Sequence, residues 1–171
     1  MVGVVKINLQ LLTKDFWIKI AICAAGYGMF SNSVVIPLVT ALGKEYPDAS
    51  LFLMNFIISG SEICALAAGL LTGILIKYVR KKHLLIWGTV TFFIAGVSGA
   101  FSPNLEFLAF TRALDAISDG ILTVTTASLI VDLWKEEQEQ GFVFGLYNML
   151  SGFFGSIASV IAGYAAVVSW R

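Results

Sequence analysis

The chain has 171 residues, of which 58% are hydrophobic and only 13% are charged, and its formal net charge is zero. Soluble domains carry about 25% charged residues, so this composition excludes an ordinary soluble domain, which needs a polar shell. The balanced charge gives no sign of a nucleic-acid partner. One histidine and two cysteines in apolar runs, Cys23 and Cys64, argue against a Cys/His zinc site, and we expect neither metal nor other cofactor.

Five long apolar stretches follow one another along the chain. A helix that crosses a bilayer needs about 20 mostly apolar residues. The stretches are continuous rather than alternating, which argues against a membrane β-barrel. Each span must satisfy its own backbone hydrogen bonds in lipid, so helices are expected. The predicted fold is an all-α polytopic bundle with transmembrane helices at about residues 16–39, 51–76, 84–101, 105–134 and 142–168.

The distribution of cations predicts how the spans are oriented. The first span is longer than the apolar core of a signal peptide and lacks a clear cleavage site, so we expect it to be retained. Excess Lys and Arg stay on the cytoplasmic side of a membrane. This rule predicts a multi-pass membrane protein with a cytoplasmic N-terminus. The cations on that side are Lys6, Lys14, Lys19, Lys77, Arg80, Lys81 and Lys82, and the loops on the other side offer only Lys44 before the last residue.

Small residues recur at four-residue intervals in the second and fifth spans. Lipid gives helices no hydrophobic reason to associate, so small residues that let them approach mark packing faces. The alternative is the ordinary glycine richness of membrane helices. The two ridges are Ala65, Gly69 and Gly73 in the second span, and Ser151, Gly155, Ser159 and Gly163 in the fifth.

The fourth span carries a polar stripe on an otherwise apolar helix. At 100° per residue, Arg112, Asp115, Asp119, Thr123 and Thr126 project within roughly 80° of one another. A charged group in mid-membrane costs at least about 2.5 to 3.5 kcal/mol, so these groups are expected to face protein or water. Arg112 can pair with Asp115 at i+3 or with Asp119 at i+7, and the second is too far for a relaxed contact.

Other spans contribute polar residues that could face this stripe. Asn55, Ser59 and Glu62 share one face of the second span, and Asn32 lies in the "SNS" of the first. One interpretation is a water-filled path lined by the first, second and fourth spans. The other is a buried ion pair with interhelical hydrogen bonds that fix the bundle. Glu62 is the better candidate for proton coupling, because its span contains no cation.

The turn between the second and third spans, "GILIKYVRKK" at 73–82, resembles a motif of the major facilitator superfamily of transporters. The family pattern is Gly-x-x-x-Asp-Arg/Lys-x-Gly-Arg/Lys-Arg/Lys, which Gly73, Lys81 and Lys82 match. Lys77 replaces the aspartate and Arg80 the second glycine. In the family the aspartate helps to hold the outward-open state. The resemblance implies a cytoplasmic gate, for which the acidic "KEEQEQ" at 135–140 could become the partner of the cationic turn.

The fourth span resembles the Arg-x-x-Gln-Gly segment of the same family. Arg112 matches the arginine, which is implicated in proton coupling in some members, while Asp115 and Ala116 replace the glutamine and glycine. Asp132 and Leu133 resemble the family's "aDl" ending before the central loop.

The end of the chain carries two further points of comparison. Drug–proton antiporters have a Gly-Pro pair in the fifth span, where this chain has Gly155-Ser156, a departure from the antiporter pattern. The final "SWR" at 169–171 is similar to the lead-in to the family's sixth helix. The resemblance implies twelve helices in two halves with a site between them. The chain is therefore expected to be an N-terminal portion, truncated before the sixth helix.

The function implied is secondary active transport of a small solute by alternating access, with proton coupling open. Asn32, Asn55, Glu62, Arg112, Asp115 and Asp119 would line the path. The partners expected are the lipid bilayer, a small-molecule substrate and the missing C-terminal half. An enzyme is not expected, because the sequence offers no nucleophile–base pair, metal spacing or phosphate loop. The alternative is a non-transporting membrane subunit or scaffold, or an inactive fragment, whose polar stripe would bind a partner helix.

Overall fold

The computed structural model describes residues 16–25, 43, 46 and 50–168, and every regular element in this part of the chain is a helix. In chain order the helices are α2 (Phe16–Ala25), α4 (Leu51–Asn55), η2 (Phe56–Gly60), α5 (Ser61–Leu75), α6 (Lys81–Ala100), α7 (Leu105–Leu133) and α8 (Glu137–Val168). α4, η2 and α5 follow one another without a break, so they form one long helix with a π turn inside it.

Within the described residues, three segments are long and apolar enough to cross a membrane: Leu51–Leu75, Leu105–Leu133 and Glu137–Tyr164. They correspond to the second, fourth and fifth predicted spans. Of the first, α2 covers the beginning, and residues 26–39 lie outside the described part of the chain, as does Asn32. The prediction of an all-helical polytopic membrane fold is confirmed, whereas five as the number of spans stays a prediction.

Two predicted boundaries differ from the structure at the helix starts. α6 begins at Lys81 rather than residue 84, directly after Arg80, whose backbone is extended with ψ 130°. α8 begins at Glu137 rather than 142, and its first turn contains Glu137 and Glu139. Carboxylates in a first turn interact favourably with the helix dipole, so the helix extends into a stretch that was predicted to be loop.

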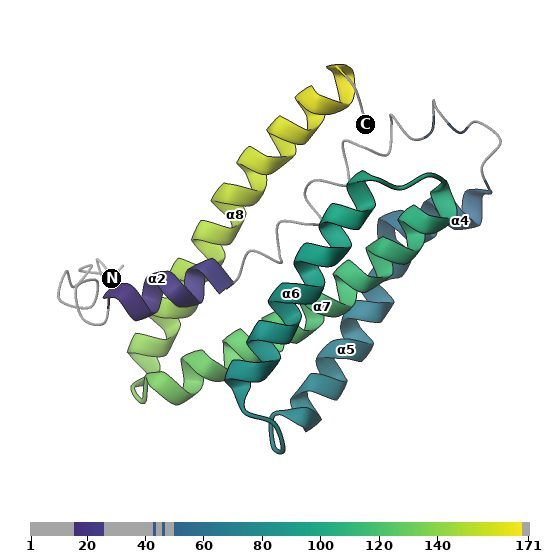
Figure 1. Cartoon of the computed structure of the whole chain (residues 1–171). Coiled ribbons are helices and arrows are strands. Elements are labelled where there is room, and N and C mark those ends of the chain that lie inside the picture. Colours follow the sequence, from purple (N-terminus) through teal and green to yellow (C-terminus); the bar gives the residue numbers. More distant parts are fainter. Residues whose placement is uncertain (1–15, 26–42, 44–45, 47–49, 169–171) are drawn as a thin grey trace.

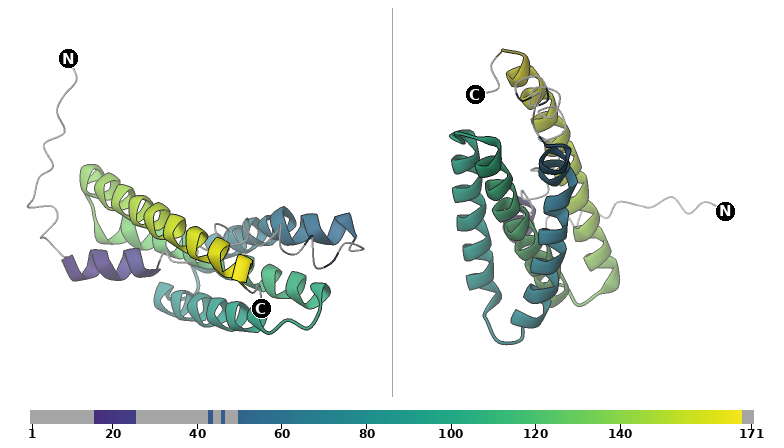
Figure 2. Two further views of the ribbon diagram at one scale, coloured as in Figure 1. Left: turned by 90° about the horizontal axis from the view of Figure 1, so that it is seen from above. Right: turned by 90° about the vertical axis from the view of Figure 1, so that its right-hand side faces the viewer.

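α7 is the central helix of the bundle, and it packs most extensively against α5 and α6 (Figures 1 and 2). The α5 contact is very close at Gly120. A Cβ there would overlap the carbonyl oxygen of Ala65 and lie 3.0 Å from the backbone nitrogen of Gly69. Ala65 and Gly69 thus pack as the ridge predicted, while the third member, Gly73, has nothing within 4 Å of an added Cβ.

A second, smaller group of contacts joins α2 and α8 to the C-terminal end of α7. Its buried apolar side chains are Ile22, Ile130, Trp134 and Val143. In Figure 1, α8 leaves the end of α7 and runs back past α2. The farther part of α8 carries exposed apolar side chains such as Val160 and Ile161. Such surface suits contact with lipid.

Candidate functional site

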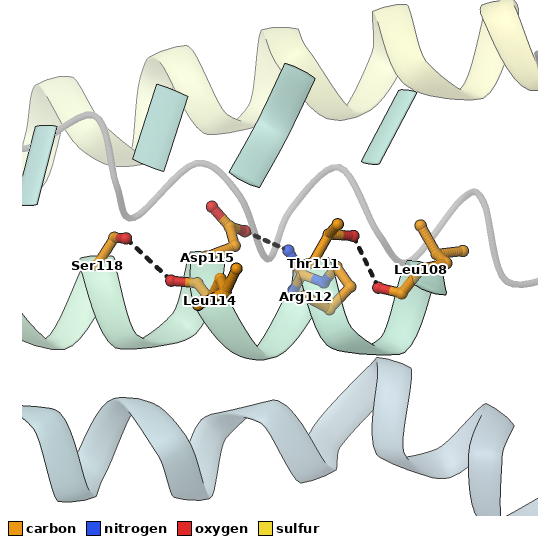
Figure 3. Close-up of polar contacts among 6 residues, drawn as sticks. All are labelled: Leu108, Thr111, Arg112, Leu114, Asp115 and Ser118. Carbon is orange, nitrogen blue, oxygen red and sulfur yellow. Dashed lines mark hydrogen bonds and ion pairs between the residues drawn. The ribbon is translucent and has the colours of Figure 1, made fainter. Parts of the chain in front are cut away.

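The polar stripe of α7 contains an ion pair between neighbouring turns of one helix (Figure 3). Nη1 of Arg112 lies 2.5 Å from Oδ2 of Asp115, and the two side chains are only 11% and 9% exposed. Of the two partners open to Arg112 in the sequence, the structure selects the aspartate at i+3. The i+3 spacing brings both groups to one helix face without help from another span.

Most hydroxyls around this pair are satisfied by the backbone of α7 itself. Thr111 donates to the carbonyl of Leu108 and Ser118 to that of Leu114, both at 2.9 Å (Figure 3). Bonds of this kind to the preceding turn are common for Ser and Thr in helices. Thr123 instead donates to Oδ1 of Asp119 at 3.4 Å. The hydroxyls of Thr125 and Thr126 are buried without a hydrogen-bond partner in the described part of the chain, so they are open, with the charged groups, to contacts outside the helix.

Glu62 of α5 joins the α7 charges in one electrostatic cluster. The charge of Arg112 interacts with those of Asp115, Glu62 and Asp119. Asp119 in turn interacts with Glu62, Asp115 and Arg112. Four of the residues predicted from the sequence are thus brought together from two helices, with three carboxylates around one guanidinium. We call Glu62, Arg112, Asp115 and Asp119 the charge cluster.

Asn55, the other described candidate on this long helix, is exposed and separated from Glu62 by the π turn η2. The predicted common face of Asn55 and Glu62 assumed an α-helical spacing throughout. A π turn holds more residues than an α turn, so the phase of the helix changes between them. The shared face of Asn55 and Glu62 therefore stays a prediction, whereas Glu62 interacts electrostatically with the α7 charges.

The α7 residues of the cluster project between the positions of α7 that meet α5 and those that meet α6. Gly120 and Val124 meet α5, and Ile121 and Leu122 meet Gly88 of α6. Arg112 projects more than about 80° from these four positions at 100° per residue. Ile130, five turns farther along, points in the same direction as Arg112 and meets α2 and α8. The direction of the stripe therefore leads, farther along α7, to its packed contact with these two helices.

The second site candidate is the cationic turn between α5 and α6. Nζ of Lys81 lies 2.5 Å from Oδ2 of Asp132 and donates to the carbonyl of Ser128 at 3.0 Å. Lys77, Arg80 and Lys82 are exposed. The acidic stretch 135–140 was expected to be the partner of this turn, and that was wrong in detail. The partner is Asp132 on the last turn of α7, because α6 starts beside the point where α7 ends.

Sequence reasoning missed the surroundings of Lys19. This side chain is buried, with its Nζ 5.9 Å from the ring centre of Trp134 and 5.7 Å from that of Phe142. A cation over aromatic faces is attracted by their quadrupoles. A lysine at the start of an apolar span is the only signal in the sequence, and it does not reveal partners from the other end of the chain.

The described part of the chain contains no group of His, Cys, Asp and Glu that could hold a metal ion. The charge cluster is instead suited to holding a charged or protonatable group. Ion pairs and unpaired carboxylates inside a membrane bundle mark substrate or proton pathways in many membrane proteins.

Comparison with known proteins places this site in a family. The sequence profile of the Major Facilitator Superfamily matches residues 18–171. The chain belongs to this superfamily, a class of helical membrane transporters, as the sequence resemblance predicted.

Three relatives have transport or resistance in their names. The chain is 23% identical to the Methylenomycin A resistance protein of Streptomyces coelicolor, over 85% of this chain and 31% of that protein. It is 28% identical to the uncharacterized MFS-type transporter YcnB of Bacillus subtilis, over 59% of this chain and 21% of YcnB. It is 26% identical to YvkA of the same organism, over 74% of this chain and 30% of YvkA. The matches thus span less than a third of each relative.

Proposed function

We propose that this chain is the N-terminal portion of a secondary active transporter that moves a small solute by alternating access. The charge cluster carries the proposal. Ionised groups in mid-membrane cost at least about 2.5 to 3.5 kcal/mol each, and a bundle that needed only packing could use apolar residues instead. Three carboxylates sharing one guanidinium leave negative charge that a solute or a proton can neutralise. The proposal assigns no enzymatic activity to the protein. It places the protein in the plasma membrane as a multi-pass protein with a cytoplasmic N-terminus.

In the proposed cycle, Arg112 and Asp115 form the fixed part of the site and Glu62 and Asp119 the adjustable part. Glu62 is exposed in the described structure, as expected for a group that meets a path or the second half of a transporter. Oδ1 of Asp119 accepts a long hydrogen bond from the hydroxyl group of Thr123. The proposal assigns proton coupling to these two carboxylates. Asn32 and Asn55 remain predicted contacts along the same path.

The turn that contains Gly73, Lys77, Arg80, Lys81 and Lys82 is the proposed cytoplasmic gate. Within this half, the turn is held by the ion pair between Lys81 at the start of α6 and Asp132 at the end of α7. The remaining half of the same protein would supply the opposing surface. In symmetric transporters of this kind the substrate site lies at the midplane between the two halves, so half of its residues would come from that partner.

The name of the Streptomyces relative makes antibiotics the first solutes to test. Resistance by a membrane transporter requires export, so expression in a sensitive host should raise the inhibitory concentration of an exported compound. Gly155-Ser156 departs from the Gly-Pro pair of drug–proton antiporters, so other small solutes belong in the same screen. The alternative function is a non-transporting subunit. Reconstituted protein would then show no flux, and crosslinking would recover a stable partner other than itself.

The decisive experiment has two stages. Sequencing past the codon for Arg171 establishes the complete product, and an open frame encoding further spans is the expected result. The complete product is then reconstituted with an internal pH dye, and solute uptake is measured between about pH 5 and pH 8. Glu62→Gln should change the pH dependence of uptake, whereas Lys135→Gln, at an exposed position outside the cluster, should not. Unchanged pH dependence in E62Q would remove Glu62 from coupling, and a stop codon after Arg171 would favour the subunit.

A further inference from the structure

The turn between α5 and α6 has more positive charge than its protein contacts use. Lys81 is paired with Asp132. Lys77, Arg80, Lys82 and His83 are exposed, and none of them forms an ion pair with any residue in the described ranges. Exposed cations repel one another, so a dense group of them is an electrostatic site for an anion.

The start of α6 adds to this positive potential. Its N-cap, Arg80, makes no side-chain capping hydrogen bond, and the first turn of α6 contains no acidic residue. The first backbone N–H groups of a helix lack intrahelical partners, and the helix dipole is positive at this end. Most helices place Ser, Asp or Glu here, whereas α6 begins with Lys81, Lys82 and His83. Asp132 compensates Lys81, whereas Lys82 and His83 form no ion pair with any described residue.

The turn also lies where lipid headgroups must be. Leu71 and Ile74 near the end of α5, and Ile86 and Trp87 near the start of α6, are exposed apolar side chains on the surfaces that suit lipid. Tyr78, between the cations, is 81% exposed. Tyrosine is enriched at the level of the headgroups, where one end of its ring is apolar and the other wet.

We propose that the turn at 76–83 binds the headgroups of anionic phospholipids in the leaflet that it faces. Charge complementarity identifies the occupant. Cations immediately beside a membrane span attract anionic lipid, and each contributes about a fivefold increase in binding. The acidic residues at the start of α8 lie at the same end of the bundle. They are the competing occupant, but none of the turn's exposed cations is paired with them in the part of the chain that the structure describes.

The test uses the whole 171-residue chain in mixed micelles that hold equal amounts of phosphatidylglycerol and phosphatidylcholine. Native mass spectrometry counts the lipids that each molecule retains. The wild-type chain should retain phosphatidylglycerol preferentially. The triple variant K77Q/R80Q/K82Q should lose about a hundredfold in that preference, at about fivefold per cation. The matched control K135Q removes one exposed cation at the same end, beside Glu136 and Glu137, and should lose less than twofold, whereas K82Q alone should lose about fivefold.

Two measurements on the wild-type chain test the proposal even if the triple variant misfolds. Raising salt from about 50 mM to about 500 mM should reduce the preference, because exposed charges are screened. Inorganic phosphate at millimolar concentration should not displace the lipid. Equal retention of both lipids by the wild-type chain would overturn the proposal, as would displacement by phosphate alone or equal losses in K82Q and K135Q. If the acidic residues occupied the turn, only E136Q/E137Q would acquire the preference.

Discussion

Two ion pairs of α7, Arg112–Asp115 and Lys81–Asp132, have the same N–O distance but differ in their exposure to solvent. Arg112 and Asp115 belong to adjacent turns of one helix, and their side chains are 11% and 9% exposed. Lys81 and Asp132 join two helices, and their side chains are 18% and 59% exposed. Both N–O distances are 2.5 Å. Equal geometry therefore does not mean equal energy, because solvent access determines what each pair contributes.

A buried pair becomes costly when it is broken, since the remaining charge has no water. When a pair at the surface breaks, water hydrates both ions, so the free-energy cost of breaking it is small. The first setting suits a fixed element of a site, and the second suits a contact that opens and closes. The middle of α7 would then be the rigid part of the proposed transporter, and its C-terminal end the adjustable part.

The largest effect is expected from Asp115→Asn. Breaking a buried ion pair by removing one partner costs about 3 to 5 kcal/mol. Unfolding of the chain in mixed micelles, titrated with a denaturing detergent, measures that loss. The control R112M/D115L replaces both charges with apolar groups and should recover most of the stability. If D115N were as stable as the wild-type chain, the pair would be hydrated and the contrast between the two ends of α7 would fail.

The next effect concerns the packing that holds the middle of α7 in place. Gly120→Ala puts a methyl group against the carbonyl of Ala65, so α5 and α7 must separate, and overpacking of this kind costs about 1 to 3 kcal/mol. The same detergent titration measures it. Gly73→Ala is the matched control, since nothing lies within 4 Å of its added Cβ. Equal losses in both variants would mean that the close approach at Gly120 does not determine stability.

A smaller effect is expected at the beginning of α7. Oδ1 of Asn104 accepts a hydrogen bond of 3.0 Å from the backbone N–H of Phe107. Asn104→Ala removes this cap and should cost about 0.5 to 2 kcal/mol. Asn104→Asp keeps an acceptor and is expected to stay near the wild-type stability. Hydrogen exchange at the first turn of α7 locates the change, and uniform exchange along the helix in both variants would contradict a local cap.

The smallest effect is expected from Lys81→Met. A pair whose carboxylate is 59% exposed contributes about 0 to 1 kcal/mol, less at high salt. A double-mutant cycle with Asp132→Asn measures the coupling energy, and the charge-reversed pair K81D/D132K should restore it. A coupling energy as large as that of the buried pair would show that the end of α7 is as rigid as its middle.

The helical fold could be predicted from the sequence because it depends on length and composition. About 20 apolar residues in a row have few alternatives in lipid. The Arg112–Asp115 pair could also be predicted, since both residues lie on one helix and the spacing is fixed by its periodicity. Membership of the superfamily followed from the order of weak motifs, each of which matched only in part.

The rest depended on contacts between distant segments, which periodicity does not encode. Gly120 was not singled out, because its role is set by Ala65 on another helix. The π turn could not be inferred from the sequence, and it changes the helix phase between Asn55 and Glu62. The acidic stretch after α7 was considered as a partner of the cationic turn, and the described partner of Lys81 is Asp132, a few residues earlier. The aromatic partners of Lys19 gave no signal at all.

The surroundings of Lys19 also constrain the order in which the protein can be assembled. Its rings belong to Trp134 and Phe142, which are synthesised long after the first helix. At ordinary translation rates the delay is on the order of ten seconds. During that interval Lys19 is at the membrane without the aromatic rings of Trp134 and Phe142 that later cover it. In the nascent chain, the charge of Lys19 therefore depends on water, lipid headgroups or the insertion machinery for solvation until α8 has been synthesised.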